Sequence, residues 1–346
     1  MISVGVVFYD ESPVVRDDFL NRLSKAMIQS QHSEKRVGEV IFVLNSNGIE
    51  LENHLKKFLQ TTNDLALNIT TKLIKNSENN IGLARKKIVE SSQADWIYFT
   101  DPDVQFEDDL FQKLGTDFNN INKNINLGKW FGITGQIVQS SDTLLLENMF
   151  KFLSNLSGLF NFSFQSVSPY RGFKVDHAPT AHLLLNKNIV LKLGNFSELF
   201  TRHGEDLDLT HRATMEQYSI YFGSTKVTHM QNLGILDLIK KFFNYGRVQA
   251  KVFFKNGSSR QRLYRMTPAL GVALIGPLAF VVGPVFSVGV VLLFLMLATA
   301  KNHLLLTALV ILTYGTGTII QIFTELNALI TRALFSQKTR QRFQLK

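Results

Sequence analysis

The sequence contains no cysteine among its 346 residues. Disulfide bonds, thiolate metal sites and a cysteine nucleophile are therefore excluded, and any bound metal ion must be held by oxygen and imidazole ligands. Charged residues are also few, at 19%, whereas hydrophobic residues make up 45% and aromatic residues 11%. This composition excludes a disordered chain, and the length suffices for one large domain or two ordinary ones.

Negative charge is nearly absent from the last third of the chain. Residues 231–346 carry 14 Lys and Arg but 2 Asp and Glu, a net charge of +12, whereas residues 1–230 carry 23 and 26, a net charge of −3. The same C-terminal part contains two uncharged runs, 266–300 and 302–324, each at or above the roughly 20 residues that a membrane-spanning helix needs. The basic residues therefore flank predicted membrane segments, and a nucleic-acid partner is not expected.

The N-terminal part alternates between apolar runs typical of buried strands and amphipathic runs typical of helices. Repeated strand, helix, strand spacing predicts an α/β domain with a mixed, mostly parallel sheet flanked by helices. Ligands of such sheets bind at the carboxyl ends of the strands. The strands are expected at 2–9, 40–44, 66–74, 96–100, 131–138, 181–185, 219–222 and 226–230, and the first helices at 14–30, 51–59 and 82–91.

The chain after this domain is expected to be membrane-associated. Residues 234–255 have helical periodicity with Phe and Ile on one side and Lys and Arg on the other, as in an interfacial helix, although a surface helix packed on the domain is the alternative. We therefore expect a soluble domain at 1–232, an amphipathic interfacial helix with a basic linker at 233–265, transmembrane segments at 266–330 and a basic cytoplasmic tail at 331–346.

The first uncharged run, of about 35 residues, is too long for one straight crossing of the roughly 30 Å hydrocarbon core. Two Gly-Pro pairs, at 276–277 and 283–284, can break it, so an interfacial or re-entrant start near Pro268 and a span ending near Ala300 are expected. The second span is expected at 303–323, which completes a transmembrane hairpin. Basic residues before and after the two spans predict that both flanks face the cytoplasm.

Two carboxylates follow the strand expected at 96–100, in Asp101-Pro102-Asp103. At the carboxyl end of a parallel strand, such a pair can hold a hard divalent cation, which neutralises a diphosphate. The alternative is a helix cap or a solvated turn.

A second polar group is Gly204-Glu205-Asp206 with Asp208 and Arg212, where Asp206 is either a functional carboxylate or a helix N-cap. His229, at the end of the last strand, either completes a metal site or is structural.

Over most of residues 1–230 the sequence resembles a family 2 glycosyltransferase of the GT-A fold. The helix that contains Tyr245-Gly246-Arg247, followed by the predicted spans, further resembles bacterial membrane-bound members that build exopolysaccharides of the succinoglycan type. The matching pieces, in this order, are Phe8-Tyr9-Asp10-Glu11, Asn80-Ile81-Gly82-Leu83-Ala84-Arg85, Asp101-Pro102-Asp103, Gly194-Asn195-Phe196, Gly204-Glu205-Asp206-Leu207-Asp208-Leu209 with Arg212, and His229.

The resemblance implies transfer of a hexose-type sugar, with inversion, from a nucleotide diphosphate sugar to a lipid-linked or glycan acceptor in cell-surface polysaccharide or glycolipid assembly. The enzyme would be multi-pass in the plasma membrane, with the catalytic domain in the cytoplasm. In this interpretation Asp103 and His229 bind Mg²⁺ or Mn²⁺, Asp206 is the general base and Glu205 assists it, which suits the need for charge neutralisation and proton removal. Nucleotide-sugar contacts are implied for Tyr9, Glu11, Asn45, Gly82, Arg85 and Asp101, and acceptor or orienting roles for Asp208 and Arg212.

The sequence also departs from the family pattern. Leu44, with Asn45 beside it, replaces the acidic residue common after the second strand, and Lys86 stands where Asn often follows Ala-Arg. The Gln-x-x-Arg-Trp of processive synthases does not occur, which favours a single-sugar transferase over a polymerase. A polyprenyl-phosphate sugar synthase, whose phosphate acceptor needs no base, and a catalytically inactive membrane scaffold are the alternatives.

Overall fold

The computed structural model describes residues 1–9, 11–31, 33, 35–45, 48–64, 68–123, 129–140, 148–149, 174–175, 177–230, 234–256 and 303–344. The chain separates into two compact units, one comprising Met1–Ser157 and Phe162–Asn232 and the other Gly158–Asn161 and Leu233–Lys346. Asp10 of the first motif and the whole uncharged run 266–300 lie outside the described residues.

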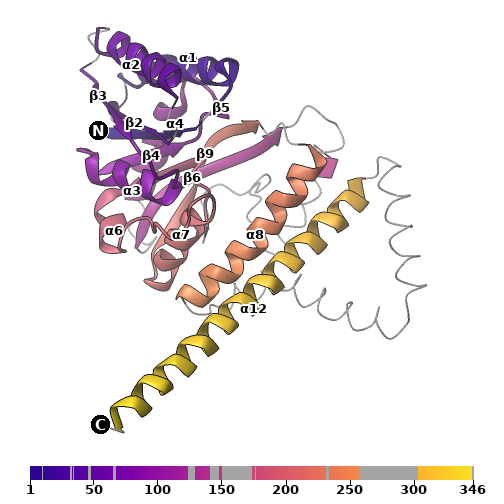
Figure 1. Ribbon diagram of the computed structural model, residues 1–346. Coiled ribbons are helices and arrows are strands. Elements are labelled where there is room, and N and C mark those ends of the chain that lie inside the picture. Colours follow the sequence, from indigo (N-terminus) through magenta and orange to yellow (C-terminus); the bar gives the residue numbers. More distant parts are fainter. Residues whose placement is uncertain are drawn as a thin grey trace. The chain divides into compact units, whose positions relative to one another are not determined.

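The first unit is an α/β fold (Figure 1). Its described strands are β1 (Ile2–Phe8), β2 (Val37–Leu44), β3 (Thr70–Lys75), β4 (Trp96–Thr100), β5 (Val104–Phe106), β6 (Trp130–Ser140), β7 (Lys174–Val175), β8 (His182–Asn186) and β9 (Ser219–Met230). Its described helices are α1 (Pro13–Ser30), α2 (Ile49–Asp64), α3 (Ile81–Ser91), α4 (Leu110–Lys123), α6 (Lys187–Lys192) and α7 (Glu205–Met215).

These strands form one sheet with the order β3-β2-β1-β4-β8-β6-β9-β5, and β7 pairs with β9. Strands β3, β2, β1 and β4 are parallel, but β8 is antiparallel to both of its neighbours and β5 and β7 are antiparallel to β9. The expected mixed sheet is confirmed, but it is parallel throughout only over its first four strands. The antiparallel strands β8, β5 and β7 account for the difference, and a short apolar run such as that of β8 fits either strand direction.

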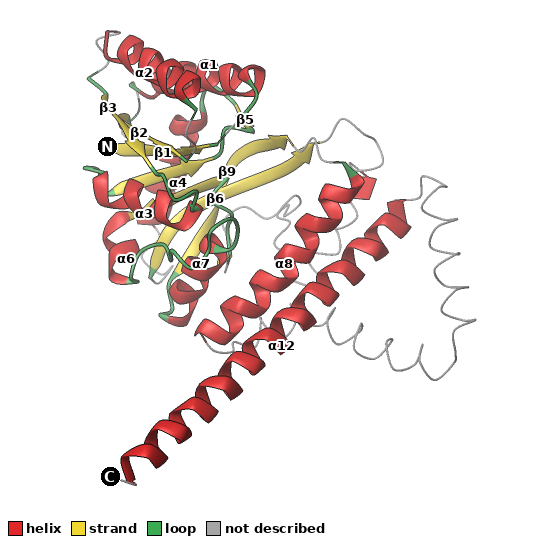
Figure 2. Ribbon diagram, in the orientation of Figure 1, coloured by secondary structure: helices red, strands yellow, loops and turns green. Residues whose placement is uncertain are grey.

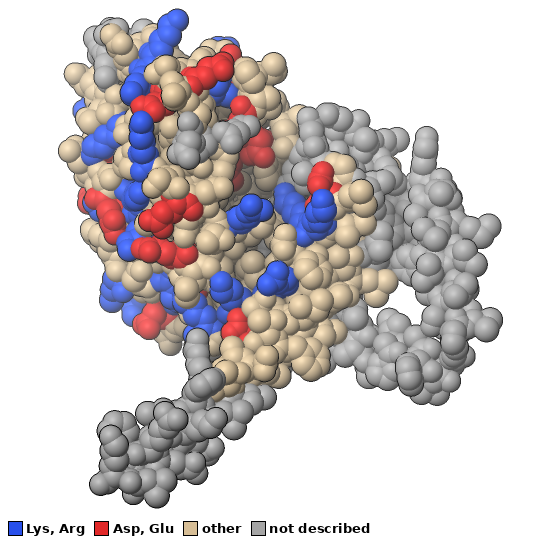
Figure 3. All heavy atoms as spheres, viewed as in Figure 1, with Lys and Arg blue, Asp and Glu red and all other residues tan. Residues whose placement is uncertain are grey.

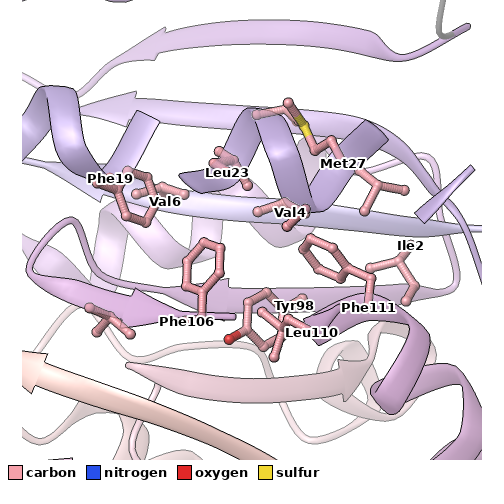
Figure 4. Close-up of a cluster of buried hydrophobic side chains, with 14 of the residues drawn as sticks. Ile2, Val4, Val6, Phe19, Leu23, Met27, Tyr98, Phe106, Leu110 and Phe111 are labelled. Carbon is pink, nitrogen blue, oxygen red and sulfur yellow. The ribbon is translucent and has the colours of Figure 1, made fainter. Parts of the chain in front are cut away.

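Helices cover both faces of the sheet (Figure 2). One buried cluster joins α1, α2 and α4 to the strands, and a second cluster joins α3, α6 and α7 to the opposite face. Strand β1 feeds both clusters because alternate side chains point to opposite faces: Val4 and Val6 pack with the first and Val7 with the second. Figure 4 shows the first cluster, in which Phe19 and Leu23 of α1 approach β1.

Strand β9 is one continuous strand, whereas two short strands were expected at 219–222 and 226–230. The polar residues between them, Gly223 to Thr225, stay in the strand because the pairing with β6 shifts register between Thr134 and Gln136. The backbone N–H of Ser224 in this segment donates to Asp117 Oδ2 at 2.7 Å. A side chain from α4 thus accepts the hydrogen bond at the irregular position.

The second unit contains α8 (Ile235–Asn256) and α12 (His303–Gln344), which pack against each other. A methyl group on Gly246 would meet the backbone of Tyr314, and one on Gly317 would meet the backbone of Phe243. Thr318 Oγ1 donates to the Gly246 carbonyl at 3.1 Å across this contact. The two helices therefore approach closely at a pair of glycines.

The helix expected at 234–255 is confirmed as α8, while its interfacial position stays a prediction. None of the helices in the described ranges combines the length and the apolar character that a membrane crossing requires. The expected second span, 303–323, falls within α12 and is not confirmed, and the expected first span lies outside the described residues.

Charge on the face drawn in Figure 3 is mixed. Blue basic and red acidic side chains of the described residues alternate there over short distances.

Candidate active site

Five of the predicted site residues lie at the carboxyl edge of the parallel strands. Tyr9 and Glu11 follow β1, Asn45 follows β2, and Asp101 and Asp103 follow β4. The matched registers of β1 with β2 and β4 bring these loops to the same edge. The Tyr9 backbone N–H donates to both carboxylate oxygens of Glu11 at 2.9 Å, which fixes that side chain beside the strand end.

Asp103 and His229 form a pair. Strand β5 is antiparallel to β9 with Val104 opposite His229, so the residue before β5 meets the imidazole: His229 Nε2 lies 3.1 Å from Asp103 Oδ2. The Met230 backbone N–H also donates to the Asp103 carbonyl at 2.9 Å. Two segments far apart in the sequence are thus joined at the side chains that the sequence predicts as metal ligands.

The Asp103 carboxylate fits Mg²⁺ or Mn²⁺, because carboxylate oxygen is a ligand that suits these cations, and the neutral imidazole of His229 is a common metal ligand in proteins. Within the described ranges no group of three or more His, Asp or Glu residues is placed to hold a metal ion. A larger set of protein ligands is not required where a phosphate ligand binds as well, since Mg²⁺ is often held by one or two carboxylates together with substrate phosphates and water.

Arg85 connects the strand edge with α7. Its side chain is buried, with 4% exposure, and its guanidinium donates to Asp101 Oδ1 at 3.0 Å and forms an ion pair with Glu205 Oε1. Glu205 is itself buried, and its second oxygen, Oε2, has no hydrogen-bond partner among the described residues. Glu205 therefore points into the protein toward Arg85.

Helix α7 begins with three acidic residues in its first turn, where the helix dipole stabilises negative charge. Its N-cap is Gly204, in a left-handed conformation with φ of 97°, so the alternative in which Asp206 caps the helix is wrong. Asp206 is half-buried, and its Oδ1 accepts the backbone N–H of Leu207 at 2.7 Å.

Asp208 and Arg212 form an ion pair that holds the turn after α6 in place. Asp208 is fully buried and accepts from Arg212 Nη2 at 2.8 Å. The same guanidinium donates to the backbone carbonyls of Leu193 and Asn195, the second at 2.7 Å. Gly194 and Asn195 both have positive φ, so these bonds hold a tight turn. Both residues belong to α7, and the pair lies on the side of this helix that meets the turn, with Asp208 enclosed by protein.

Gly82 lies at the start of α3, in backbone contact with the loop that leads to α7. A Cβ at Gly82 would meet the Ser197 carbonyl, and the Gly82 N–H donates to the Phe200 carbonyl at 3.2 Å. The neighbouring Ile81 N–H donates to Thr201, and Asn80 caps α3 by accepting from Leu83 N–H at 3.0 Å. The first amides of α3 are thus engaged within the protein.

Asn45 belongs to a cluster of amides. Its Oδ1 accepts from Asn76 Nδ2 at 2.6 Å, and its Nδ2 donates to Asn79 Oδ1 at 3.4 Å. Asn45 and Asn76 are both buried. The cluster fixes the orientation of the Asn45 amide beside Leu44, the residue that replaces the acidic residue of the family pattern.

Electrostatics sets these groups apart from ordinary surface carboxylates. Burial raises the pKa of Glu11 to about 7, and the nearby Asp103 and Asp101 carboxylates add to the increase. Burial also raises the pKa of Asp101, although the Arg85 guanidinium opposes the change. Loss of hydration likewise raises the pKa of Tyr9. Carboxylates with raised pKa values in one location are typical of functional sites.

The roles predicted from sequence remain predictions, but the structure brings most of these residues together. Tyr9, Glu11, Asp101, Asp103 and His229 interact with one another, and Arg85 links them to α7. The Arg85–Glu205 ion pair and the contribution of Asn76 were not predicted from the sequence. The burial of Arg85 did have a signal in the sequence, because Arg85 lies three residues before Ile88 and four before Val89, on the inward face of α3.

A family model described as Glycosyl transferase family 2 matches residues 3–176. No curated protein sequence matches the chain. Among solved structures, the mannosyltransferase PcManGT from Pyrobaculum calidifontis, in complex with GDP-Man and Mn²⁺, is similar with a TM-score of 0.57 and 14% identity. The match covers 93% of this chain and 86% of that one, which shows a shared fold.

A second similar structure is GalNAc-T7 with UDP, GalNAc and Mn²⁺, with a TM-score of 0.48 and 13% identity over 72% of this chain. This chain spans only 47% of the length of GalNAc-T7. The Staphylococcus aureus protein TarS, residues 1–349 in complex with UDP, has a TM-score of 0.47 and 15% identity over 77% of this chain and 68% of that one.

Proposed function

The chain belongs to glycosyl transferase family 2, and from this premise we propose that it transfers a hexose-type sugar, with inversion, from a nucleotide diphosphate sugar to an acceptor hydroxyl. The observation that carries the proposal is the Asp103–His229 pair, 3.1 Å apart beside Asp101 at the carboxyl edge of the sheet. Ligands of α/β sheets bind at this edge, and a leaving diphosphate needs positive charge there.

Asp103 and His229 would hold Mg²⁺ or Mn²⁺ in this proposal. The bound cation supplies the positive charge that neutralises the leaving diphosphate. Asp101 would contact the ribose of the donor, and Tyr9, Glu11 and Asn45 would line the nucleotide part of the site. PcManGT, which has the same fold, is itself in complex with GDP-Man and Mn²⁺, which supports this assignment.

Asp206 is the proposed general base. Its Oδ1 accepts the Leu207 N–H, so Oδ2 is the oxygen that would take the proton of the acceptor hydroxyl. The acceptor oxygen then bonds to the anomeric carbon, and the bond from that carbon to the diphosphate oxygen breaks with its electron pair. The proton stays on Asp206 until the product leaves.

The acceptor is proposed to be lipid-linked or presented at a membrane, in cell-surface polysaccharide or glycolipid assembly. The support is the charge of +12 over residues 231–346 with its uncharged runs, and the glycine contact of α8 with α12. Close contacts at small residues are common between membrane helices. We place the protein in the plasma membrane, with the catalytic unit in the cytoplasm.

The function is tested with Asp103→Asn in the full-length protein, assayed for Mn²⁺-dependent release of nucleoside diphosphate from a panel of nucleotide sugars. Loss of most activity, with unchanged thermal stability, is expected because Asp103 is not part of the core. The matched control is Asp95→Asn, the same substitution at an exposed residue before the other end of β4. Full activity of Asp103→Asn at ordinary Mn²⁺ concentration would overturn the metal assignment.

The membrane proposal is tested by fusing topology reporters to residue 1 and residue 346. Both ends are expected on the cytoplasmic side, since basic residues flank both ends of the two runs. Reporters on opposite sides would show that the runs cross the membrane an odd number of times.

A further inference from the structure

We propose that Arg85 is a positioning residue that fixes the first turn of α7, and with it Asp206, relative to the donor side of the site at Asp101. Its catalytic consequence rests on the proposed function. Sequence resemblance implies that Arg85 contacts the nucleotide sugar. The geometry points instead to a guanidinium whose two arms are both occupied by carboxylates of the protein.

The charges show why this link is strong. Arg85 and Glu205 are 4% and 2% exposed, so the ion pair is shielded from water. Glu205 Oε2 has no hydrogen-bond partner among the described residues, and Arg85 is therefore the group that compensates its charge. Removing one partner of a buried ion pair leaves an uncompensated charge, which is strongly unfavourable.

Arg85 also acts from a helix that already holds the loop before α7. Asn80 Nδ2 donates to the Glu198 carbonyl at 2.8 Å, and the amides of Ile81 and Gly82 donate to the same loop. One turn further along α3, Arg85 reaches Glu205. Helix α3 thus contacts the segment 197–205 from its beginning to the first turn of α7.

The consequence for Asp206 follows from chain connectivity. Asp206 comes directly after Glu205 in the same helical turn, so a displacement of Glu205 moves the proposed base as well. Arg85 simultaneously holds Asp101, which leads into Asp103. A single guanidinium thereby sets the spacing between the donor side and the base, and a misplacement of about 1 Å can cost on the order of 10²-fold in rate.

The experiment compares Glu205→Gln and Arg85→Lys in the full-length protein. Glu205→Gln keeps the shape but loses the ion pair, so kcat should fall by about tenfold or more while the donor KM and the Mn²⁺-dependent affinity for nucleoside diphosphate change by less than about threefold. Arg85→Lys keeps the charge but not the two-armed geometry, so it should remain folded, lose kcat and raise the donor KM through Asp101.

The matched control is Glu39→Gln, at a fully buried carboxylate that pairs with Lys72 at 2.7 Å on the other edge of the sheet. It should lower the melting temperature without changing kcat or KM of the folded protein. Turnover of Glu205→Gln within twofold of wild type, or normal kinetics of Arg85→Lys, would overturn the proposal.

A double variant separates this proposal from the proposed function. Melting temperatures of Arg85→Lys, Glu205→Gln and the double variant should be non-additive, because the residues share one contact. This measurement needs no activity. Additive shifts overturn the Arg85–Glu205 link, whereas coupled shifts in a protein that turns over no nucleotide sugar would confirm the link and overturn the transferase function.

Discussion

The two edges of the sheet shift the pKa values of their buried carboxylates in opposite directions. At the amino edge, Glu39 of β2 is fully buried, yet it accepts hydrogen bonds from the Ser3 hydroxyl and the Gln93 N–H and pairs with Lys72 at 2.7 Å. Although burial by itself would raise it, these partners together lower the pKa of Glu39. The amino edge therefore stabilises the buried carboxylate of Glu39 as an anion.

The carboxyl edge gathers more carboxylates than cations. Glu11, Asp101 and Asp103 interact there, and Arg85 and His229 are the basic groups that oppose them. The pKa values of Glu11 and Asp101 are raised, in contrast to that of Glu39. At the amino edge, hydrogen bonds and an ion pair compensate the buried carboxylate and thereby stabilise the fold. At the carboxyl edge, carboxylates outnumber basic groups, and this is where a cationic ligand is proposed.

The largest effect is expected for Asp206→Asn, at the proposed base next to Glu205, which Arg85 connects to Asp101 at the carboxyl edge. Asn keeps the hydrogen bond to Leu207 but cannot take a proton, so turnover should fall by about 10² to 10⁴ while donor affinity is retained. Steady-state kinetics and donor titration measure both quantities, with Asp95→Asn as the charge-matched control. Turnover within a few fold of wild type would mean that another group is the base, and the catalytic role proposed for Asp206 would be wrong.

The amino edge is tested by Lys72→Met, which leaves Glu39 buried without its cationic partner. We expect a loss of about 3 kcal/mol in the free energy of unfolding, near the lower end for buried pairs because Lys72 is 28% exposed. Urea denaturation gives this value. The folded variant should keep the kcat and KM of the wild type, and a selective loss of kcat would show that the amino edge also serves catalysis.

Glu11→Gln distinguishes the two edges of the sheet by the sign of the pH dependence of folding stability that their carboxylates cause. Because the folded pKa of Glu11, about 7, exceeds its ordinary value of 4.5, the folded state binds the extra proton, and stability falls as pH rises between these values. In Glu11→Gln this fall should shrink by on the order of 3 kcal/mol. Unfolding measured from pH 4.5 to 8 without divalent cations tests it.

Glu39 should behave in the opposite way, since a lowered folded pKa contributes stability that is lost as pH falls below about 4.5. If Glu11→Gln has the same pH profile as the wild type, the raised pKa of Glu11 is wrong.

The smallest effect is expected for Lys86→Met. Lys86 pairs with Glu198 at 2.5 Å on the loop that α3 holds, but the two side chains are 34% and 48% exposed. Exposed pairs contribute little, so the unfolding free energy should change by less than about 0.5 kcal/mol. A loss as large as that of Lys72→Met would mean that exposure does not separate the two kinds of ion pair.

Local patterns predicted the elements whose sequence and surroundings agree. Strand β4 occupies the expected residues, 96–100, because its apolar run is buried on both faces. Strand β5 was missed because three residues carry no periodic signal. The start of α7 was not fixed, because its N-cap, Gly204, has no side chain to mark a helix start.

The candidate site shows the same division. Asp101, Asp103 and His229 could be named from sequence, since the two aspartates follow a strand and His229 lies near the end of one, and the order of the strands brings them to one edge. The Arg85–Glu205 ion pair could not be predicted, because it depends on how α3 and α7 pack on the same face of the sheet. Sequence indicated which groups carry charge, and only the tertiary structure shows which charges compensate each other.

Strand β5 has a further consequence for the affinity of the site. It is an edge strand of three residues, and its ladder with β9 is what brings Asp103 to His229. Short edge ladders open locally at low free-energy cost, and a ligand that binds only the closed form stabilises that form by mass action. The measured affinity for a divalent cation would therefore include the equilibrium between the open and the closed pairing of β5 with β9. Substitutions within β5 would then weaken binding without changing either Asp103 or His229.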